Sequence, residues 1–296
     1  MTSDTRGAFG QIGIWSGALH RSRADDAGTA AITEAVAELE DLGYGTLWIG
    51  GSPSPDDAAA VVDATRSITV ATGILSIWDH PAADVAARIA KLGADARGRL
   101  VLGLGVSHGP MVPQYAKPYS AMVAYLDALD SATPPVDPGH RVLAALGPKM
   151  LKLAAGRTLG AHPYLVTTEH TAEAREALGP DALLAPELSV VLDTDLDRAR
   201  TTARTMLAMY LQLPNYTDNL LRLGFSESDF EDGGSIRLLD ALFALGDAEH
   251  VRTRARQYLD AGADHIALQV LTADEGGSGL PRAEWRALAE AFGDEL

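Results

Sequence analysis

A short basic stretch that follows an apolar strand is the first feature of the chain with ligand-binding potential. Residues 145–157 read ALGPKMLKLAAGR, with a proline near the first position of a predicted helix. The free backbone N–H groups of such a first turn, together with the positive end of the helix dipole, form an anion site. Lys149, Lys152 and Arg157 gather positive charge on this helix in an otherwise acidic chain. The alternative is that the Gly-Pro pair forms only a tight turn and that the lysines are a solvated face.

A glycine-rich segment, GLGVSHG at residues 103–109, ends another apolar strand. It looks superficially like a dinucleotide-binding fingerprint, but no helix starts directly after it and no acidic residue follows at the required distance. The missing side chains instead leave room for a planar ring, with Ser107 and His108 as polar groups at its edge. A lone histidine is commonly a surface or core residue, and its place at a strand end makes His108 a candidate for chemistry.

Three of the four tryptophans fall at the early strands, where aromatic walls would suit a conjugated ring. Trp15 ends the first strand, Trp48 lies in the second and Trp78 follows the third. The alternation of the second strand leaves a different location open for Trp48, outward in the helix layer. Asp79 is expected to be the N-cap of the helix that begins near Pro81.

Composition excludes several classes of site and partner. The chain has no cysteine and no H-x-x-H or H-E-x-x-H pair, so we expect no metal site, and a serine hydrolase is not expected either. A net charge of −16 and a pI of about 4.8 argue against nucleic acid or an anionic membrane as partner. The N-terminus lacks an apolar signal core and no stretch is long enough to span a membrane, so the expected location is the cytoplasm.

The elements that must position these residues alternate between strand and helix. Helix periodicity is present between the strands, in segments such as residues 30–42, 83–92, 150–159 and 196–211. Apolar strand-like segments number eight, at residues 11–15, 46–49, 68–75, 100–105, 142–146, 162–166, 184–192 and 265–271. This pattern predicts an α/β protein with a (β/α)8 TIM barrel, built as one domain over residues 1–296. Two segments interrupt the repeat, near residues 106–118 and 213–245, and insertions of this kind are commonly lids or oligomer contacts.

Long ungapped pieces of the chain resemble a known family. They include VATGILSIW, RLVLGLGVSHGPMV, RVLAALGPKMLKLA, LPNYTDNLLRLGF and AGADHIALQVL. The chain is similar to the luciferase-like barrel superfamily and, within it, to actinobacterial oxidoreductases thought to use the deazaflavin coenzyme F420. The resemblance implies a (β/α)8 barrel, a homodimer, and a cofactor at the C-terminal ends of the strands.

The resemblance also implies site residues. In relatives a non-proline cis peptide backs the deazaflavin ring, and the matching bond here is Gly73-Ile74. The residues implied to border the ring are Gly105, Val106, Ser107 and His108. Those implied to meet the phosphate are Ala145, Leu146, Gly147, Pro148 and Lys149, with Tyr164, Leu165 and Val166 near the phosphate-bearing tail.

One departure from the family bears on the reaction. Relatives that oxidise sugar phosphates carry a histidine after the second strand and a glutamate after the fourth, whereas this chain has Gly50-Gly51 and His108 there. That reaction is therefore not expected.

The leading hypothesis is an F420-dependent oxidoreductase acting on a small organic molecule, with His108 as proton donor or hydrogen-bonding group. The alternatives are an FMN-dependent reductase or monooxygenase and a non-catalytic cofactor-binding barrel. A homodimer is also expected because the apolar helix predicted at residues 238–245 needs cover.

Overall fold

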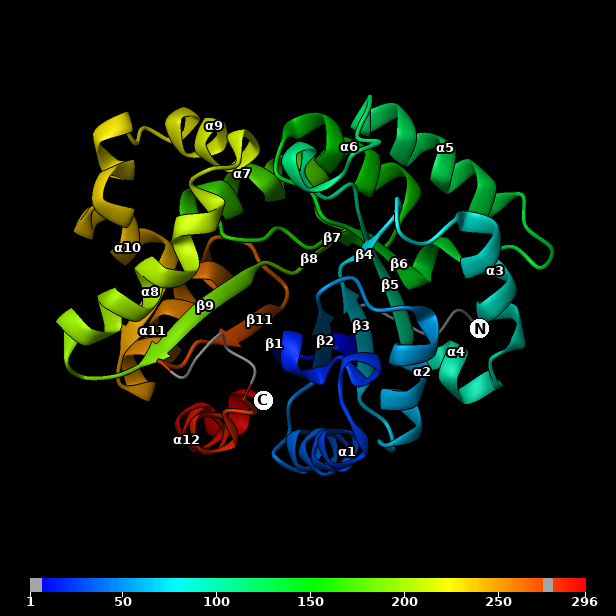
Figure 1. Ribbon diagram of the computed structural model, residues 1–296, viewed down its shortest axis with the longest axis horizontal. Helices are drawn as coiled ribbons and strands as arrows, with labels where there is room; N and C mark the ends of the chain where they lie inside the picture. Colours follow the sequence, from blue (N-terminus) through cyan, green and yellow to red (C-terminus); the bar gives the residue numbers. More distant parts are fainter. Residues whose placement is uncertain (1–6, 274–278) are drawn as a thin grey trace.

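Strand and helix alternate along the chain around a curled parallel sheet, which confirms the predicted TIM-barrel-like fold (Figure 1). The computed structural model describes residues 7–273 and 279–296. Within this part of the chain the strands are β1 (Ile12–Ser16), β2 (Thr46–Gly50), β3 (Thr69–Gly73), β4 (Leu75–Ser76), β5 (Leu100–Gly105), β6 (Arg141–Leu143), β7 (Gly160–Ala161), β8 (Leu183–Leu184), β9 (Glu187–Leu192), β10 (Phe243–Gly246) and β11 (Ile266–Val270).

The helices lie on the outside of this sheet, and several begin with a polar cap that explains their position. Asp25, Asp195 and Asp247 each accept a backbone N–H of the first turn, as N-cap residues do. The described α-helices are α1 (Asp26–Asp41), α2 (Pro55–Asp63), α3 (Ala82–Lys91), α4 (Ala94–Arg99), α5 (Pro118–Asp130), α6 (Pro148–Arg157), α7 (Thr168–Leu178), α8 (Leu196–Tyr210), α9 (Pro214–Arg222), α10 (Ile236–Leu242), α11 (Ala248–Asp260) and α12 (Arg282–Phe292). None of these helices is long and apolar enough to cross a membrane.

The barrel closes where one long strand is interrupted by a proline. β8 and β9 are two parts of that strand, separated by Ala185 and Pro186. The N–H of Ala185 donates to Ala161 of β7, while the carbonyl of Pro186 accepts from Ala267 of β11. The interruption therefore bridges two edges of the sheet, and β1 completes the ring by pairing in parallel with both β11 and β2.

Two predicted elements differ in the structure. The segment 162–166 is a loop, because β7 ends at Ala161 and Leu165 takes a left-handed backbone conformation with φ 53° that a strand does not allow. The helix predicted through residue 245 ends at Leu242, and the next four residues form β10, which pairs with β9 from Ser189 onward. Both errors arise because side-chain contacts and sheet pairing, rather than the local apolar pattern, decide these short segments.

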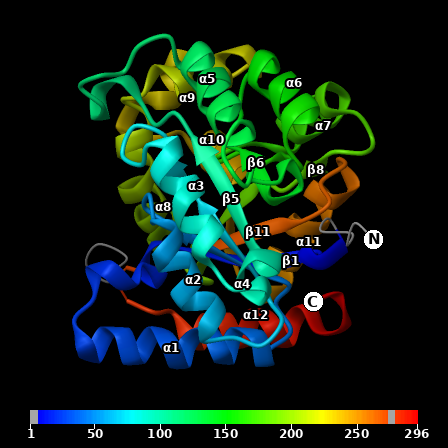
Figure 2. The same cartoon turned by 90° about the vertical axis from the view of Figure 1, so that its right-hand side faces the viewer.

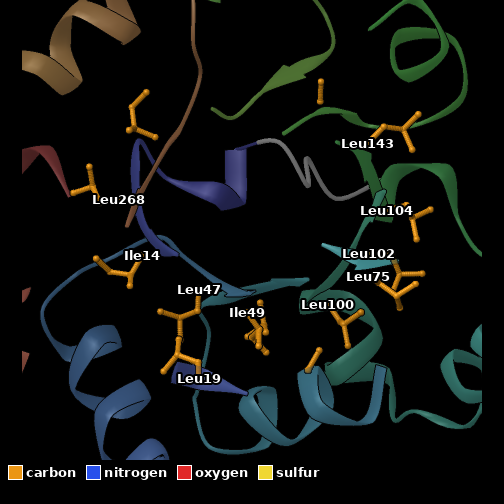
Figure 3. Close-up of a cluster of buried hydrophobic side chains, with 14 of the residues drawn as sticks. Ile14, Leu19, Leu47, Ile49, Leu75, Leu100, Leu102, Leu104, Leu143 and Leu268 are labelled. Carbon is orange, nitrogen blue, oxygen red and sulfur yellow. The ribbon is translucent and has the colours of Figure 1, made fainter. Parts of the chain in front are cut away.

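Outward-facing strand residues carry the larger hydrophobic core. Ile14, Leu47, Ile49, Leu102 and Leu268 are buried between the sheet and the surrounding helices (Figure 3). Alternate positions face the opposite way, because successive side chains of a strand point to opposite faces. The interior of the barrel is therefore filled by a separate, smaller cluster of residues.

Trp48 lies in this interior cluster and is fully buried, so the outward location left open by the sequence is wrong. Its indole stacks on His162 with ring centroids 4.0 Å apart, and its Nε1 donates to Nε2 of His265 over 3.0 Å. Burial lowers the pKa of both histidines to about 4, so each ring is neutral. Trp48 thus packs inside the barrel and is not exposed to a ligand.

The last α-helix, α12, packs against the first, α1. α1 and α12 lie side by side in both views (Figures 1 and 2), and Glu38 of α1 forms ion pairs with Arg282 and Arg286. The hydroxyl of Tyr44 also donates to the backbone carbonyl of the buried Trp285 over 2.7 Å. The two ends of the described chain therefore support the same side of the barrel.

Candidate functional site

The end of β3 carries the feature that the family resemblance implies. The Gly73-Ile74 peptide bond is cis, which confirms the prediction. The carbonyl of Gly73 accepts a hydrogen bond from Nε1 of Trp15 over 3.0 Å, and a Cβ placed on Gly50 or Gly73 would come within 2.4 Å of the indole. These glycines therefore allow the Trp15 ring to lie directly across the ends of β2 and β3.

The glycine-rich end of β5 lies against the same point. A Cβ on Gly105 would approach Cδ1 of Ile74 to 2.4 Å, so the Ile74 side chain packs directly on the backbone of Gly105. Next along the chain, the carbonyl of Val106 accepts from Nε1 of Trp78 over 2.6 Å, and Ser107 has a left-handed backbone with φ 54°. The structure thus brings together Ile74 and the segment 105–107, with Ile74, Val106 and Ser107 only partly buried.

His108 lies at the end of this segment and contacts the second insertion. Its Nδ1 donates to Oδ1 of Asn215 over 3.2 Å, and its ring lies 5.4 Å from the ring of Tyr216. Burial lowers the pKa of His108, while the hydrogen bond to Asn215 raises it. A neutral imidazole that donates from Nδ1 keeps Nε2 as an acceptor.

Aromatic rings continue from His108 back to the barrel strands, and we name this set the aromatic arc. Its members are Trp15, Tyr164, Tyr210, Tyr216 and His108. Successive ring centroids lie 5.6, 5.4, 5.1 and 5.4 Å apart. Sequence reasoning missed Tyr210 and Tyr216, although the NYTDN sequence of the insertion was a visible signal for the latter.

Two tyrosine hydroxyls of the arc are linked by hydrogen bonds. The hydroxyl of Tyr210 donates to that of Tyr164 over 3.2 Å, and the hydroxyl of Tyr164 donates to Oε1 of Gln269 over 2.8 Å. Burial raises the pKa of both tyrosines above the ordinary value of 10, so both remain protonated at neutral pH. The chain of bonds connects the end of α8 to β11 across the end of the barrel.

Glu187 is a buried acid that sequence reasoning also missed. It is 1% exposed at the start of β9, where it accepts hydrogen bonds from Oγ of Ser189 over 2.5 Å and from the backbone N–H of Leu165 over 3.1 Å. Burial raises the pKa of Glu187 to about 7, against the lowering effect of these two bonds. The only signal in the sequence is a single acidic residue inside an apolar strand.

The predicted anion site lies at the start of α6. Gly147 is the N-cap and makes no side-chain cap, and its carbonyl accepts from Met150 and Leu151, so the N–H of Lys149 has no partner among the described residues. The carbonyl of Leu146 accepts from Nε2 of the buried His170 over 2.9 Å, which fixes the turn before the helix.

The basic cluster predicted on α6 is smaller than expected. Lys149 and Lys152 are exposed and, within residues 7–273 and 279–296, form no ion pair. Arg157 instead binds Asp127 and Asp130 of α5, at 2.8 and 2.7 Å, at the far end of the helix. The prediction that Arg157 belongs to the cluster is therefore wrong, because its guanidinium group is paired with the carboxylates of Asp127 and Asp130.

The three residues predicted near the cofactor tail, in the loop after β7, are placed differently from one another. Tyr164 belongs to the aromatic arc and is partly exposed, whereas the side chains of Leu165 and Val166 are 1% exposed in the core.

Asp79 does not cap α3, whose N-cap is Pro81 without a side-chain bond. It accepts instead from Oγ of Ser52 over 3.1 Å, so that prediction is wrong. Across the described residues, acidic and histidine side chains form no cluster suited to a metal ion.

Comparison with known proteins places this geometry in a family. The sequence model of the family described as luciferase-like monooxygenase matches residues 11–265. No curated protein matches the chain.

Several solved structures share the fold along nearly their whole length. One is an F420-dependent secondary alcohol dehydrogenase in complex with an F420-acetone adduct, at 15% identity and a TM-score of 0.72, covering 95% of this chain and 98% of that one. A coenzyme F420 dependent tetrahydromethanopterin reductase from Methanopyrus kandleri has 16% identity and a TM-score of 0.73, covering 96% and 98%.

A third similar structure contains FMN. It is the oxygenating constituent of 3,6-diketocamphane monooxygenase from Pseudomonas putida, at 14% identity and a TM-score of 0.69, covering 97% of each chain. The family match over most of the chain and the shared fold agree: the chain belongs to the luciferase-like monooxygenase family.

Proposed function

We propose that the chain is a coenzyme F420-dependent oxidoreductase that transfers hydride between the deazaflavin and a small organic substrate. The observation that carries the proposal is the convergence of two features at the C-terminal ends of the strands. One is the wall formed by Gly73, Ile74 and the segment 105–107, and the other is the uncapped N-terminus of α6. A flat ring with an anionic tail needs both.

The start of α6 fits a phosphate. A Cβ on Gly147 would meet nothing within 4 Å, so the approach to the first turn is open. The free N–H of Lys149, its side-chain ammonium group and the helix dipole would all favour an anion at this point. Ala145, Leu146, Gly147, Pro148 and Lys149 would hold the phosphate, whereas Leu165 and Val166 would contact the tail only through their backbone because their side chains are buried.

The wall at the ends of β3 and β5 fits a ring system. Ile74, Val106 and Ser107 are partly exposed, and Gly73 and Gly105 leave no side chains between the backbone and a ring. When bound, the deazaflavin would supply the hydride chemistry, and the protein orients both partners and excludes water. His108 is proposed to bind the substrate through Nε2, which the bond from Nδ1 to Asn215 leaves as an acceptor.

Lys152 favours F420 over FMN. It lies about one turn beyond Lys149 on the exposed face of α6, farther from the first turn of the helix. The tail of F420 continues beyond its phosphodiester as a chain of glutamates, whereas FMN ends at its phosphate. The glutamate tail of F420 would give this second lysine an electrostatic partner that FMN lacks, and two of the similar structures named above are F420-dependent.

The first experiment tests cofactor retention. Purified protein is mixed with F420 or with FMN, and the visible absorbance that stays with the protein after gel filtration is measured. We expect F420 to be retained. Retention of FMN alone would support the flavin alternative, and retention of neither would support a non-catalytic barrel.

The second experiment tests the anion site by charge reversal. Lys149→Glu should weaken F420 binding at least about tenfold, roughly 1.4 kcal/mol, and by less at high salt. Lys152→Glu should weaken F420 binding to a smaller extent and leave FMN binding unchanged. The matched control is Lys91→Glu, an exposed lysine at the end of α3. Unchanged F420 affinity in a folded Lys149→Glu protein, measured by isothermal titration, would place the anion elsewhere.

A further inference from the structure

The contacts of the candidate site form a closed ring of residues that starts and ends at the Gly73-Ile74 bond. From Gly73 they run through the arc residues Trp15, Tyr164, Tyr210 and Tyr216 to His108. From His108 the backbone leads back to Gly105, which packs on Ile74, the partner of Gly73 in the cis bond. One side of this circuit is the wall proposed for the cofactor ring. The opposite side is aromatic, and a substrate that meets the ring would lie against it.

Among the described residues, no charged side chain hydrogen-bonds to the aromatic side: the hydroxyls of Tyr164 and Tyr210 bond to each other and to Gln269, and His108 bonds to Asn215. Burial raises the pKa of Tyr210 and Tyr216, and the carboxylate of Glu187 raises it further. Both oxygens of Glu187 already accept hydrogen bonds, from Ser189 and from Leu165. The available polar groups are therefore phenol hydroxyls, a neutral imidazole and two amides.

We propose, on the basis of the proposed function, that the substrate is an uncharged molecule with an apolar body and one hydroxyl or carbonyl oxygen that hydrogen-bonds to Tyr210. A buried charge is costly unless it is paired, and no charged side chain in the described part of the chain hydrogen-bonds to the arc. An anionic substrate would face Glu187 and a chain of net charge −16. A cationic substrate could not reach the carboxylate of Glu187, because that side chain is 1% exposed.

Tyr210 has hydrogen-bonding capacity left for a substrate, as Nε2 of His108 has. Tyr164 donates to Gln269 and accepts from Tyr210, so its hydroxyl is engaged in both directions. Tyr210 only donates, and its oxygen keeps its lone pairs for a substrate hydroxyl. The Tyr210 hydroxyl can also rotate away from Tyr164 to donate to a carbonyl. The apolar body of the substrate would then lie on the rings of the arc.

The test compares three probes that share a six-membered ring: cyclohexanol, cyclohexanecarboxylate and cyclohexylammonium. Binding to the full chain is measured by saturation-transfer NMR titration, with and without F420. We expect cyclohexanol to bind at least tenfold more tightly than either charged probe. Equal or tighter binding of a charged probe, or no binding of cyclohexanol at millimolar concentration, overturns the proposal.

Two variants assign the binding to the arc. Tyr210→Phe keeps the ring and removes the hydroxyl, so cyclohexanol affinity should fall about threefold to tenfold. Tyr119→Phe, at an exposed tyrosine of α5, is the control and should change nothing. An unchanged affinity in Tyr210→Phe, with the fold intact by circular dichroism, overturns the role of Tyr210.

F420 binding is read separately in the same samples from its visible absorbance. Tyr210-dependent binding of cyclohexanol without any F420 binding would refute the proposed function and leave the inference standing. F420 binding together with preference for a charged probe would refute only the inference.

Discussion

Glu187 shows how much a single buried residue contributes to the behaviour of the barrel. Its carboxyl group accepts from Ser189 and Leu165, and burial raises its pKa from 4.5 to about 7. The bond to Leu165 holds the loop after β7 in its left-handed turn and so fixes the neighbouring Tyr164 in the aromatic arc. Its ionised form is unfavourable in the folded state, because no cation among the described residues compensates it.

Glu187→Gln should change how stability depends on pH. The pKa is raised in the folded state, so the carboxyl group does not destabilise the fold below pH 4.5, and stability falls as pH rises toward 7. The total loss is on the order of 3 kcal/mol for a pKa raised from 4.5 to about 7. The glutamine variant should lack this loss. The free energy of unfolding of the variant minus that of the wild type should therefore increase as pH rises from 4.5 to 7.

Urea denaturation at several pH values measures this difference, and Ser189→Ala serves as a comparison that keeps the acid. Parallel stability curves for wild type and Glu187→Gln would contradict the prediction.

Residues differ in how far the sequence could reveal them. The positions 73, 74 and 105–108 could be placed because they sit at strand ends in a pattern that the family shares. Tyr210 and Glu187 could not, because a tyrosine at a helix end and an acid in a strand have no local signature. Their roles depend on partners at Tyr164 and Leu165, which the chain reaches only after folding.

At the scale of elements, β3 and β5 are held together so closely that one position has no room for a side chain. A Cβ on Gly103 would lie 2.0 Å from the backbone carbonyl oxygen of Thr72, whose own hydroxyl donates to the carbonyl of Gly103. A backbone atom cannot move aside as a flexible side chain can. The close approach of these strands therefore requires glycine.

Gly103→Ala should lower the free energy of unfolding by at least about 2 kcal/mol, because overpacking would force two strands apart. Gly98→Ala is the matched control: Gly98 lies in α4 and a Cβ there would meet nothing within 4 Å. The control should be neutral or gain up to about 1 kcal/mol from better helix propensity. Equal stability of the two variants in chemical denaturation would refute the packing argument.

Elements with a strong period were predictable, and short ones were not. The strand at Leu100–Gly105 and the helix at Leu196–Tyr210 agree with the sequence prediction to within a residue. β7 has only two residues, and β10 follows a helix without any polar or glycine break. For such segments the pairing partner decides the conformation, and the local sequence does not contain it.

At the scale of the whole molecule, the reason given for a homodimer needs correction. Leu238, Leu239 and Leu242 were expected to need cover from a partner, but they are buried within the same chain. Among the described residues, four of the five exposed large apolar side chains lie on neighbouring helices, and they are Leu196 and Met209 of α8, Leu221 of α9 and Ile236 of α10. We keep the prediction of a homodimer on this different basis.

Light scattering should give twice the chain mass of 31.1 kDa, with an interface that buries more than about 1,000 Å² in total. Ile236 is 53% exposed, and Ile236→Glu should shift the equilibrium toward monomer. Glu227→Gln is a control that alters a charge near the same helix without adding one to the apolar surface. A monomer mass for the wild type at all concentrations would refute the prediction.

The uncapped start of α6 has a consequence for how cofactor binding and folding are linked. Three other helices use an aspartate to satisfy their first turn, whereas α6 begins with Gly147. A phosphate bound there would occupy the position that those carboxylates fill elsewhere. The cofactor would then complete a helix as well as take part in a reaction, and the apo chain would be less stable by roughly the worth of one N-cap, about 1 kcal/mol. The negative charge at the start of this helix would thus come from the ligand, whereas the other three helices take it from an aspartate of the chain.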